Sequence, residues 1–395
     1  MISRRKVFVG SSTTALALNS FFMKALAEAA EARKIPGEVE LRGMDGRMKR
    51  LGTLDLESQQ DFTVGFRVMQ SKLIRKASNE HFDKVLAAHG VDPTMPIIMD
   101  EVLKLIENEP LINIAPKTWL ANQQITWKTL SDYYHVNADL YLSEMEAADK
   151  QGPGSLELNP SMEIPQYARH EIHIQPGGYV GDEFAGHLYH YGTNSFYVAV
   201  YGHNEQDQVH RGAASRLPLP EDGKVNRILD MGCGPGQLTV ALKERFPDAE
   251  VWGIDVGGPM VRYAHMRASD LGSAANFAQR LAEETHFPDN HFDIVTSQIM
   301  HHEMPAEISR KIVAEAHRLT RSGGVYYPMD FISGGAKAPA RSMYARWWDH
   351  RWNNEVWTLD YHAMDFNAEI AKYFRLVQNA KSAIPGLGAR HAVKV

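Results

Sequence analysis

The sequence is poor in cysteine and in long apolar runs. Cys233 is the one cysteine among 395 residues. A single thiol cannot form an internal disulfide, and no paired Cys or His/Cys spacing suggests a structural zinc site. No apolar run approaches the roughly 18 to 20 residues of a membrane span. These absences exclude a disulfide scaffold, and we predict no stable membrane span.

Dense positive charge is also missing. The chain has 42 basic and 48 acidic residues, which gives a net charge of −6. It lacks the basic block that would follow a phosphate backbone, so nucleic acid is not a predicted partner. The hydrophobic fraction of 44% and the charged fraction of 23% are those of an ordinary globular protein. A chain of this length has room for two or three domains.

The chain opens with a basic segment that is followed by a short apolar one. Arg4 and Arg5 precede the mildly apolar stretch Val7–Phe22, and Ala25-Leu26-Ala27 offers a small-x-small cleavage pattern. The adjacent arginines make this segment resemble a twin-arginine (Tat) export signal. We therefore predict a signal peptide over residues 1–27 and a periplasmic protein. The alternative is a cytoplasmic protein whose basic start is never cleaved.

Residues 28–150 are predicted to form a small all-α domain. From Asp61 onward, apolar residues recur at the spacing of a helix face, first at Phe62, Phe66, Met69 and Leu73. We interpret this stripe as core rather than as a ligand site, together with Trp119, Trp127 and Leu130. A helical domain of this kind fits either a dimerisation element, which would give a homodimer, or a cap over the substrate.

Residues 151–215 are predicted to be a linker and a lid segment. Gln151–Ser155 is a cluster of helix and strand breakers, and the stretch from Tyr167 to His210 that follows is dense in His and Tyr. His-x-x-His spacings arise easily in a chain with 18 histidines. No metal site is therefore predicted for the four histidines with that spacing, His170, His173, His187 and His190.

Residues 216–395 alternate between strand and helix patterns. Apolar runs at 227–231, 251–254, 294–297 and 325–329 alternate with helical patterns such as 238–245 and 259–268, which predicts a parallel α/β sheet. The runs 374–377 and 391–395 predict an antiparallel hairpin at the end of the sheet. The predicted fold class is α/β, a Rossmann-like doubly wound sheet with an antiparallel C-terminal hairpin, preceded by the all-α domain.

A glycine-rich turn lies between the first of these strands and its helix. Its sequence is Asp230-Met231-Gly232-Cys233-Gly234-Pro235-Gly236. Glycine permits a tight turn and lets a ligand approach the backbone. The second strand ends at Asp255, 19 residues after Gly236, where a carboxylate accepts both hydroxyls of a ribose. We interpret Cys233 as a small buried residue of this turn rather than as a nucleophile.

Two later motifs separate this pattern from that of NAD-binding domains. Phe287–Asp293 leads into the fourth strand, and Leu319–Gly324 precedes the fifth. Over about 170 residues, the order of these elements resembles class I S-adenosylmethionine-dependent methyltransferases of the ubiquinone/menaquinone and sterol methyltransferase type. The resemblance implies that S-adenosylmethionine (SAM) is the cofactor and that its methyl group passes to a small-molecule acceptor. The acceptor atom is sulfur, oxygen or activated carbon, and transfer is an in-line displacement. The alternative is a non-catalytic sensor or scaffold that binds SAM or S-adenosylhomocysteine (SAH).

The resemblance also implies a donor site. Asp230, Gly232, Gly234 and Gly236 would hold the methionine end of the cofactor, and Asp255 would hold the ribose. Met260 would pack near the adenine, and Gln298 would lie at the mouth of the active site. Many relatives have an acidic residue for the adenine amino group where this chain has Leu281. We therefore expect adenine recognition from the backbone around Ala282, from Glu283 or from Gln279.

The acceptor side is predicted from two further segments. His301 and His302 follow the fourth strand at the carboxyl edge of the sheet, where ligands bind, so they are the candidate catalytic bases, with Glu303 beside them. In similar enzymes the segment before the glycine turn lines the acceptor pocket. The predicted substrate contacts there are Tyr189, His190, Tyr191 and Tyr197. The tryptophan-rich stretch from Arg346 to Trp357 predicts a helical insertion over the pocket.

Overall fold

The computed structural model describes residues 43–377 and 387–395. The predicted signal peptide over residues 1–27 lies outside the described residues and stays a prediction. Within the described part of the chain, no helix has both the length and the apolar character that a membrane crossing requires.

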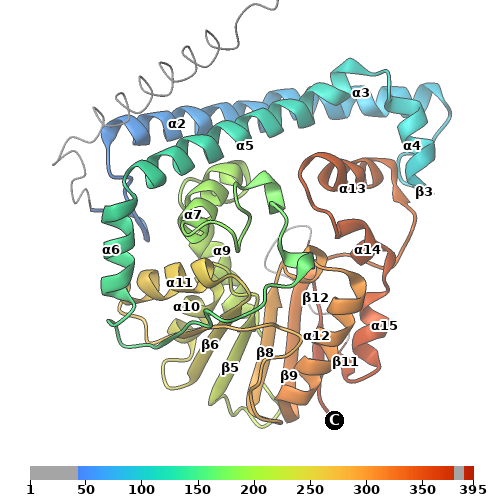
Figure 1. Cartoon of the computed structure of the whole chain (residues 1–395). Coiled ribbons are helices and arrows are strands. Elements are labelled where there is room, and N and C mark those ends of the chain that lie inside the picture. Colours follow the sequence, from blue (N-terminus) through green and yellow to red (C-terminus); the bar gives the residue numbers. More distant parts are fainter. Residues whose placement is uncertain (1–42, 378–386) are drawn as a thin grey trace, which may run out of the picture.

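A nine-stranded mixed sheet forms the centre of the molecule (Figure 1). Strands β4 to β9 pair in parallel, and the strands at the C-terminal end pair antiparallel to β9 and to each other. The strands, in spatial order, are β11 (Arg375–Val377), β13 (His391–Val393), β9 (Thr320–Phe331), β8 (Phe292–Gln298), β5 (Arg227–Met231), β6 (Glu250–Asp255), β7 (Asn276–Gln279) and β4 (Leu156–Glu157), with β12 (Leu387–Ala389) also paired with β9. The predicted doubly wound sheet with a terminal antiparallel hairpin is confirmed.

The order of the strands reverses at β5. From β5 the chain proceeds to β6 and β7 on one side and then returns to β8 and β9 on the other. In open α/β sheets, ligands bind outside the carboxyl ends of the strands at such a switch point. The carboxyl ends of β5 and β8 therefore mark where a ligand site is expected.

Helices cover both faces of the sheet. Ile228 and Leu229 are neighbours in β5, but they belong to different hydrophobic cores because successive side chains of a strand point to opposite faces. Ile228 packs against α9 and α10, and Leu229 packs in the core that includes residues of α12 and α15. The helices around the sheet are α7 (Ala185–Phe196), α8 (Val198–Tyr201), α9 (Gln206–Arg216), α10 (Gln237–Arg245), α11 (Gly258–Asp270), α12 (Ala306–Leu319), α13 (Ala340–Trp352), α14 (Thr358–Ala363) and α15 (Phe366–Ala371).

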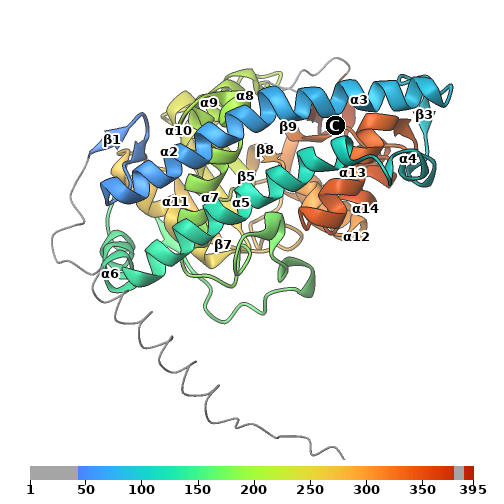
Figure 2. The same cartoon turned by 90° about the horizontal axis from the view of Figure 1, so that it is seen from above.

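A layer of long helices lies across α7 and the insertion α13–α14 (Figures 1 and 2). Its two longest parts, α2 with α3 and the antiparallel α5, run side by side. Trp127 and Leu130 of α5 are buried against Phe184 and Phe196, so their predicted place in the core is confirmed. The layer consists of α2 (Leu54–Met69), the π-helical turn Gln70–Ile74, α3 (Arg75–Ala88), α4 (Met99–Ile106), α5 (Pro110–Val136) and α6 (Ala138–Ala148).

The apolar stripe on α2 faces outward, so the prediction that it forms core is wrong. The exposed fractions of Phe62, Met69 and Leu73 are 74%, 40% and 64%. The opposite face is buried, because its polar side chains find partners on the neighbouring helices. Gln60 donates to Ser195 Oγ at 2.6 Å, and the Arg67 guanidinium stacks on Trp119 at 3.7 Å from the ring centre. Periodicity alone did not show which face of this helix points inward.

Asp207 joins α9 to three other elements. Its carboxylate accepts hydrogen bonds from Arg47 at 3.0 Å, from Gln237 at 2.7 Å and from Arg267 of α11. Burial alone would raise the pKa of Asp207, but Arg267 and the other donors lower it to about 2. Because the pKa in the folded state is below that of a free aspartate, this carboxylate stabilises the fold above about pH 4.

We expect Asp207→Asn to lower the free energy of unfolding at pH 7 by about 2 kcal/mol. The difference from the wild type should shrink as the pH falls from about 4 to 2, because the carboxyl of the unfolded chain becomes protonated there while the native carboxyl does so only near pH 2. Urea unfolding at pH 7, 4 and 3 measures this, with the exposed Asp248→Asn as control. An equal loss of stability at all three pH values would contradict the assignment.

Candidate active site

The glycine turn between β5 and α10 is shaped by its backbone and by Asp255. Gly232, Gly234 and Gly236 have φ angles of 68°, 52° and 75°, in the left-handed region that favours glycine. Asp255 accepts hydrogen bonds from the backbone N–H groups of Gly234 at 3.0 Å and Gly257 at 2.8 Å. The end of β6 therefore holds the turn in place.

Gly236 is required for packing rather than for ligand contact. It does not line the cavity described below, and a Cβ added to it would lie 2.8 Å from Ala264 Cβ and 2.8 Å from the Phe277 ring. Gly223 offers a matched control, since its φ is 69° and nothing lies within 4 Å of an added Cβ.

We expect Gly236→Ala to lower the free energy of unfolding by about 2–4 kcal/mol, from backbone strain and overpacking together. Gly223→Ala introduces the backbone strain without the overpacking, so it should lower the free energy of unfolding by about 1 kcal/mol. Urea unfolding of both variants separates the two effects. Equal losses would show that the close approach of α11 does not constrain the turn.

A cavity of about 380 Å³ opens at the carboxyl ends of β5 and β8. It lies where the strand order reverses, and the segment from Tyr167 to Val180 contributes to its wall. Gly236 and Gln279, the latter one of the alternatives for adenine, do not line it. The other residues that were predicted to bind the cofactor do: Asp230, Gly232, Gly234, Asp255, Met260, Ala282, Glu283 and Gln298.

Asp230 is a buried carboxyl at the start of the turn. Its exposed fraction is 1%, and its Oδ2 accepts a hydrogen bond from Thr239 Oγ1 at 2.7 Å. Burial raises the pKa of Asp230 to about 7. Because this carboxyl lines the cavity, a ligand with a positively charged group would favour its ionised form. Cys233 is buried in the same turn, as predicted, and burial raises the pKa of its thiol.

Of the residues expected to recognise adenine, Glu283 has a free acceptor in the cavity. Its Oε1 accepts a hydrogen bond from the Tyr167 hydroxyl at 2.7 Å, and its buried Oε2 has no partner among the described residues. The side chain of Gln279 is already engaged, since it accepts from the Asn159 backbone at 3.1 Å and donates to the Val256 carbonyl at 3.1 Å. Glu283 is therefore the side chain that fits an amino group.

Only two of the four predicted substrate residues, one in α7 and one at the junction of α7 and α8, reach the cavity. Tyr189 and Tyr197 line it, whereas His190 and Tyr191 do not. His190 Nδ1 lies 2.7 Å from the Tyr263 hydroxyl, and the Tyr191 hydroxyl donates to the Lys49 carbonyl at 2.7 Å. Consecutive helical residues point about 100° apart, so Tyr189 and Tyr191 cannot share one face.

His301 is not placed to act as a base. Its ring is fully buried and does not line the cavity. Nδ1 lies 2.8 Å from Ser309 Oγ, and Nε2 lies 2.9 Å from the Tyr326 hydroxyl. Burial lowers the pKa of His301 to about 4. With both ring nitrogens engaged, this residue fixes the loop after β8.

His302 lines the cavity but is held as a cation. Its Nδ1 donates to Asp330 Oδ1 at 2.7 Å. Burial alone would lower the pKa of His302, but Asp330 raises it to about 10. A protonated imidazole has no lone pair with which to accept a proton. His302 therefore supplies positive charge to the cavity at neutral pH rather than a base.

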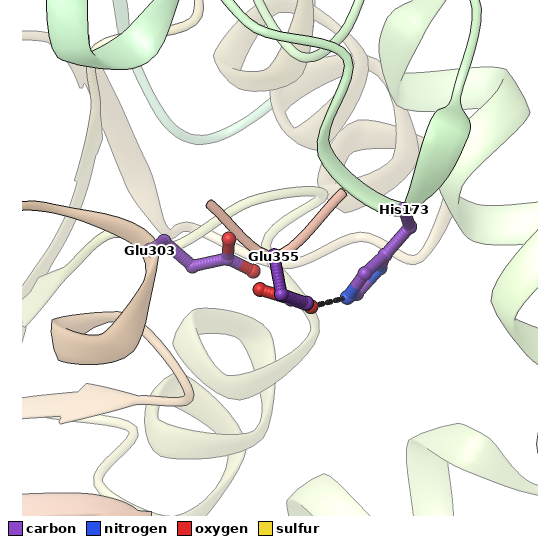
Figure 3. A group of neighbouring side chains, drawn as sticks. All are labelled: His173, Glu303 and Glu355. Atoms are coloured by element: carbon purple, nitrogen blue, oxygen red, sulfur yellow. Dashed lines mark ion pairs between the residues drawn. The ribbon is translucent and has the colours of Figure 1, made fainter. Parts of the chain in front are cut away.

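Sequence reasoning missed a charged cluster in the cavity wall, formed by His173, Glu303 and Glu355 (Figure 3). One ligand atom from each residue lies within 4.8 Å of the others. Glu303 was noted only as a neighbour of the two histidines. Glu355, between α13 and α14, belongs to no recognisable motif, and neither does the pairing of His173 with it. A signal for this cluster exists only in three dimensions.

Helix α5 holds this wall of the cavity in place. Gln123 Nε2 donates to the His173 carbonyl at 2.6 Å and to Asn353 Oδ1 at 2.8 Å, and Trp127 Nε1 donates to the same carbonyl at 2.9 Å. His173 and the following Ile174 both have positive φ angles, 52° and 53°. These hydrogen bonds hold a strained turn that directs the His173 ring towards Glu355.

The strands around the turn match a known domain family. Residues 228–324 match the family model described as a methyltransferase domain. The match begins in β5 and ends in β9, so it includes the glycine turn, Asp255 and the cluster residue Glu303. Residues 228–324, around the switch point of the sheet, are thus similar to a methyltransferase domain.

Named relatives agree with this match. A demethylmenaquinone methyltransferase from Thermus thermophilus is 35% identical over 105 residues, which are 27% of this chain and 47% of that protein. A ubiquinone/menaquinone biosynthesis C-methyltransferase from Burkholderia mallei is 34% identical over 106 residues, 27% of this chain and 43% of that protein. The chain thus spans about half the length of the curated relatives it matches.

Solved structures are similar over part of the chain. A putative methyltransferase from Bacillus halodurans C-125 has 22% identity and a TM-score of 0.35, and the match covers 39% of this chain and 65% of that one. Magnesium protoporphyrin IX methyltransferase from Synechocystis PCC 6803 with bound SAM has 15% identity and a TM-score of 0.34. That match covers 51% of this chain and 84% of the other.

Proposed function

We propose that this protein is a SAM-dependent methyltransferase that acts on a small-molecule acceptor. The observation that carries the proposal is a cavity whose wall contains both the glycine turn with Asp255 and the cluster of His173, Glu303 and Glu355, which is only partly buried. The glycine turn and Asp255 suit a nucleoside with an amino-acid tail, and the cluster suits a polar acceptor. The methyltransferase domain match over residues 228–324 supports the same function.

The part of the cavity that would bind SAM, here called the donor half, is assigned from the hydrogen bonds that its residues can make. The Asp255 carboxylate would accept the ribose hydroxyls, as acidic residues after the second strand do in dinucleotide-binding folds. Glu283 Oε2 would accept the adenine amino group, and Met260 would pack on the ring. Asp230 lies at the turn itself, where it would face the positively charged ammonium group of the methionine end.

The protein's main task in methyl transfer is alignment. A lone pair of the acceptor forms the new bond to the methyl carbon, and the S–CH₃ bond breaks with its electrons passing to sulfur, which leaves neutral SAH. Holding acceptor, methyl and sulfur in line supplies much of the rate acceleration. Tyr189 and Tyr197 line the cavity, where their rings would favour the cationic sulfonium.

Calorimetric titration of the full chain with SAM and, separately, with SAH tests the donor site. We expect one molecule of each to bind per chain, with dissociation constants in the micromolar range. A folded protein that binds neither would overturn the proposal. The relatives are named as methyltransferases of quinone compounds, so phenols and quinones are the first acceptors to test.

A further inference from the structure

The cluster of His173, Glu303 and Glu355 has unusual chemistry for the wall of a cavity. The three residues come from the lid segment, the loop after β8 and the loop between α13 and α14. All three line the cavity, and Glu355 is only 5% exposed. In Figure 3 the Glu355 carboxylate lies between the Glu303 carboxylate and the His173 ring, with which it forms an ion pair. Three potential metal ligands thus converge on one point.

Two oxygens of this cluster lack an N–H or hydroxyl partner. Glu303 Oε2 and Glu355 Oε2 are both buried, and no N–H group or hydroxyl among the described residues donates a hydrogen bond to either. Two adjacent buried carboxyl groups cannot both ionise unless a positive charge lies between them, and without one they share a proton. A cation between them would supply that charge and take the place of the proton. The unpartnered Glu355 oxygen lies on the side of Glu303, where such an ion would lie (Figure 3).

We propose that His173, Glu303 and Glu355 bind a divalent metal cation that chelates the methyl acceptor through two adjacent oxygens. This inference rests on the proposed function. One imidazole and two carboxylates suit a first-row divalent ion such as Mn²⁺, Fe²⁺ or Zn²⁺. Three protein ligands leave coordination positions open, as catalytic metal sites do. Because the cluster lines the cavity, those positions face the acceptor.

A bound cation would determine which class of acceptor fits the site and how the attacking oxygen loses its proton. A hydroxyl that coordinates a divalent ion loses its proton more readily, so the proton passes to solvent before transfer. The resulting oxyanion forms the O–CH₃ bond while the S–CH₃ bond breaks and its electrons pass to sulfur. The second oxygen of the acceptor stays bound to the metal and fixes the orientation of the acceptor. The acceptor class is therefore an aromatic vicinal diol or another compound with adjacent hydroxyls.

Residues next to the cluster would hold the metal ligands in position. His302 Nε2 lies 3.6 Å from Glu303 Oε1, and the same ring is held by Asp330. The His173 carbonyl is held by Gln123 and Trp127 of α5. Outer partners of this kind fix the orientation of metal ligands, and their loss typically weakens metal binding roughly 10–100-fold.

Mn²⁺ binding to the full chain, after a chelator has removed any bound metal, tests the site. Electron paramagnetic resonance measures the binding. We expect one Mn²⁺ per chain, and a loss of affinity of at least roughly tenfold in both Glu303→Gln and Glu355→Gln. The exposed Glu307→Gln of α12 undergoes the same chemical change and should bind like the wild type. Failure of the wild type to bind Mn²⁺ at millimolar concentration, or wild-type binding by both cluster variants, would overturn the proposal.

SAM titration of the same variants separates this inference from the proposed function. Glu355→Gln should still bind SAM, because Glu355 lies outside the donor half; this also shows that the variant is folded. Loss of Mn²⁺ affinity with SAM binding retained supports the metal site. If the wild type binds no SAM, the proposed function fails, whatever the result with Mn²⁺.

Catechol and phenol test the chelation. With Mn²⁺ bound, catechol should displace metal-bound water and lower the relaxation rate of the water protons, whereas phenol, with one oxygen, should do so far less. Equal effects of the two compounds, or none from either, would contradict chelation of the acceptor.

Discussion

Replacing Asp255 with alanine is expected to abolish SAM binding at concentrations that saturate the wild type. Under the proposed function this carboxylate accepts two ribose hydroxyls, and hydrogen bonds to a charged group contribute about 1.5–3 kcal/mol each. A loss of at least about 3 kcal/mol corresponds to a dissociation constant roughly 100-fold higher or more. Asp255 also holds the Gly234 and Gly257 amides, so the turn itself would loosen. Calorimetric titration measures the change.

Two controls keep the Asp255 result interpretable. Asp248→Ala removes an exposed carboxylate in the turn that precedes the same strand and should bind SAM like the wild type. Circular dichroism of Asp255→Ala shows whether the fold survives. A folded Asp255→Ala protein with wild-type affinity for SAM would mean that the ribose is bound elsewhere.

Replacing Asp330 with asparagine is expected to lower the free energy of unfolding by about 3–5 kcal/mol, because it leaves the buried His302 cation without its counter-charge. Asp330 is fully buried. Its carboxylate accepts from His302 Nδ1 at 2.7 Å and from the backbone N–H groups of His301 and Met300 at 2.7 Å and 3.2 Å. The asparagine amide nitrogen cannot accept any of these hydrogen bonds. Denaturant unfolding at pH 7 measures the loss.

Asp360→Asn, at an exposed position of α14, is the matched control for Asp330 and should change stability by less than about 0.5 kcal/mol. A similarly small change for Asp330→Asn would show that His302 is neutral in the folded protein. In that case His302 would become a candidate base again, and its assignment as a fixed cation would be wrong.

Local sequence signals singled out residues that the structure brings together in the wall of one cavity. The glycine turn and the carboxylate at the end of the second strand lie close together in the sequence, and backbone geometry dictates their residue types. Gly236 shows the limit of such signals, because its role is to let α11 and β7 approach rather than to contact a ligand. Glu283 could be proposed from the sequence, but its unpartnered oxygen appears only in the structure.

The acceptor side depends on contacts that no local pattern records. Tyr191 was grouped with Tyr189 by composition, but the geometry of a helix sends the two side chains to different surfaces. Phe62 was placed in the core because its spacing is that of an apolar face, yet the structure buries the polar face beside it. His301 and His302 are adjacent in sequence, but their pKa values shift in opposite directions: burial lowers that of His301, whereas Asp330, which contacts the ring of His302 only, raises that of His302.

No local sequence pattern indicates the proposed metal site. The four spaced histidines do not converge: His190 lies against Tyr263 in the core, whereas His173 meets two carboxylates that are distant in the sequence. Convergence of this kind depends on the insertion α13–α14 and on the lid segment folding over the same edge of the sheet. Only the tertiary structure brings those elements together, so a metal proposal could not precede it.

The most direct test of methyl transfer at this cavity follows a labelled methyl group. The full chain is incubated with SAM labelled with ¹³C on the methyl, with Mn²⁺ and with a panel of catechols, phenols, thiols and quinones. We expect a methylated product and an equal amount of SAH, with catechols preferred and with no product from Asp255→Ala. Micromolar SAM binding without label transfer to any acceptor would contradict the proposed enzyme and favour a protein that only senses or displays the cofactor.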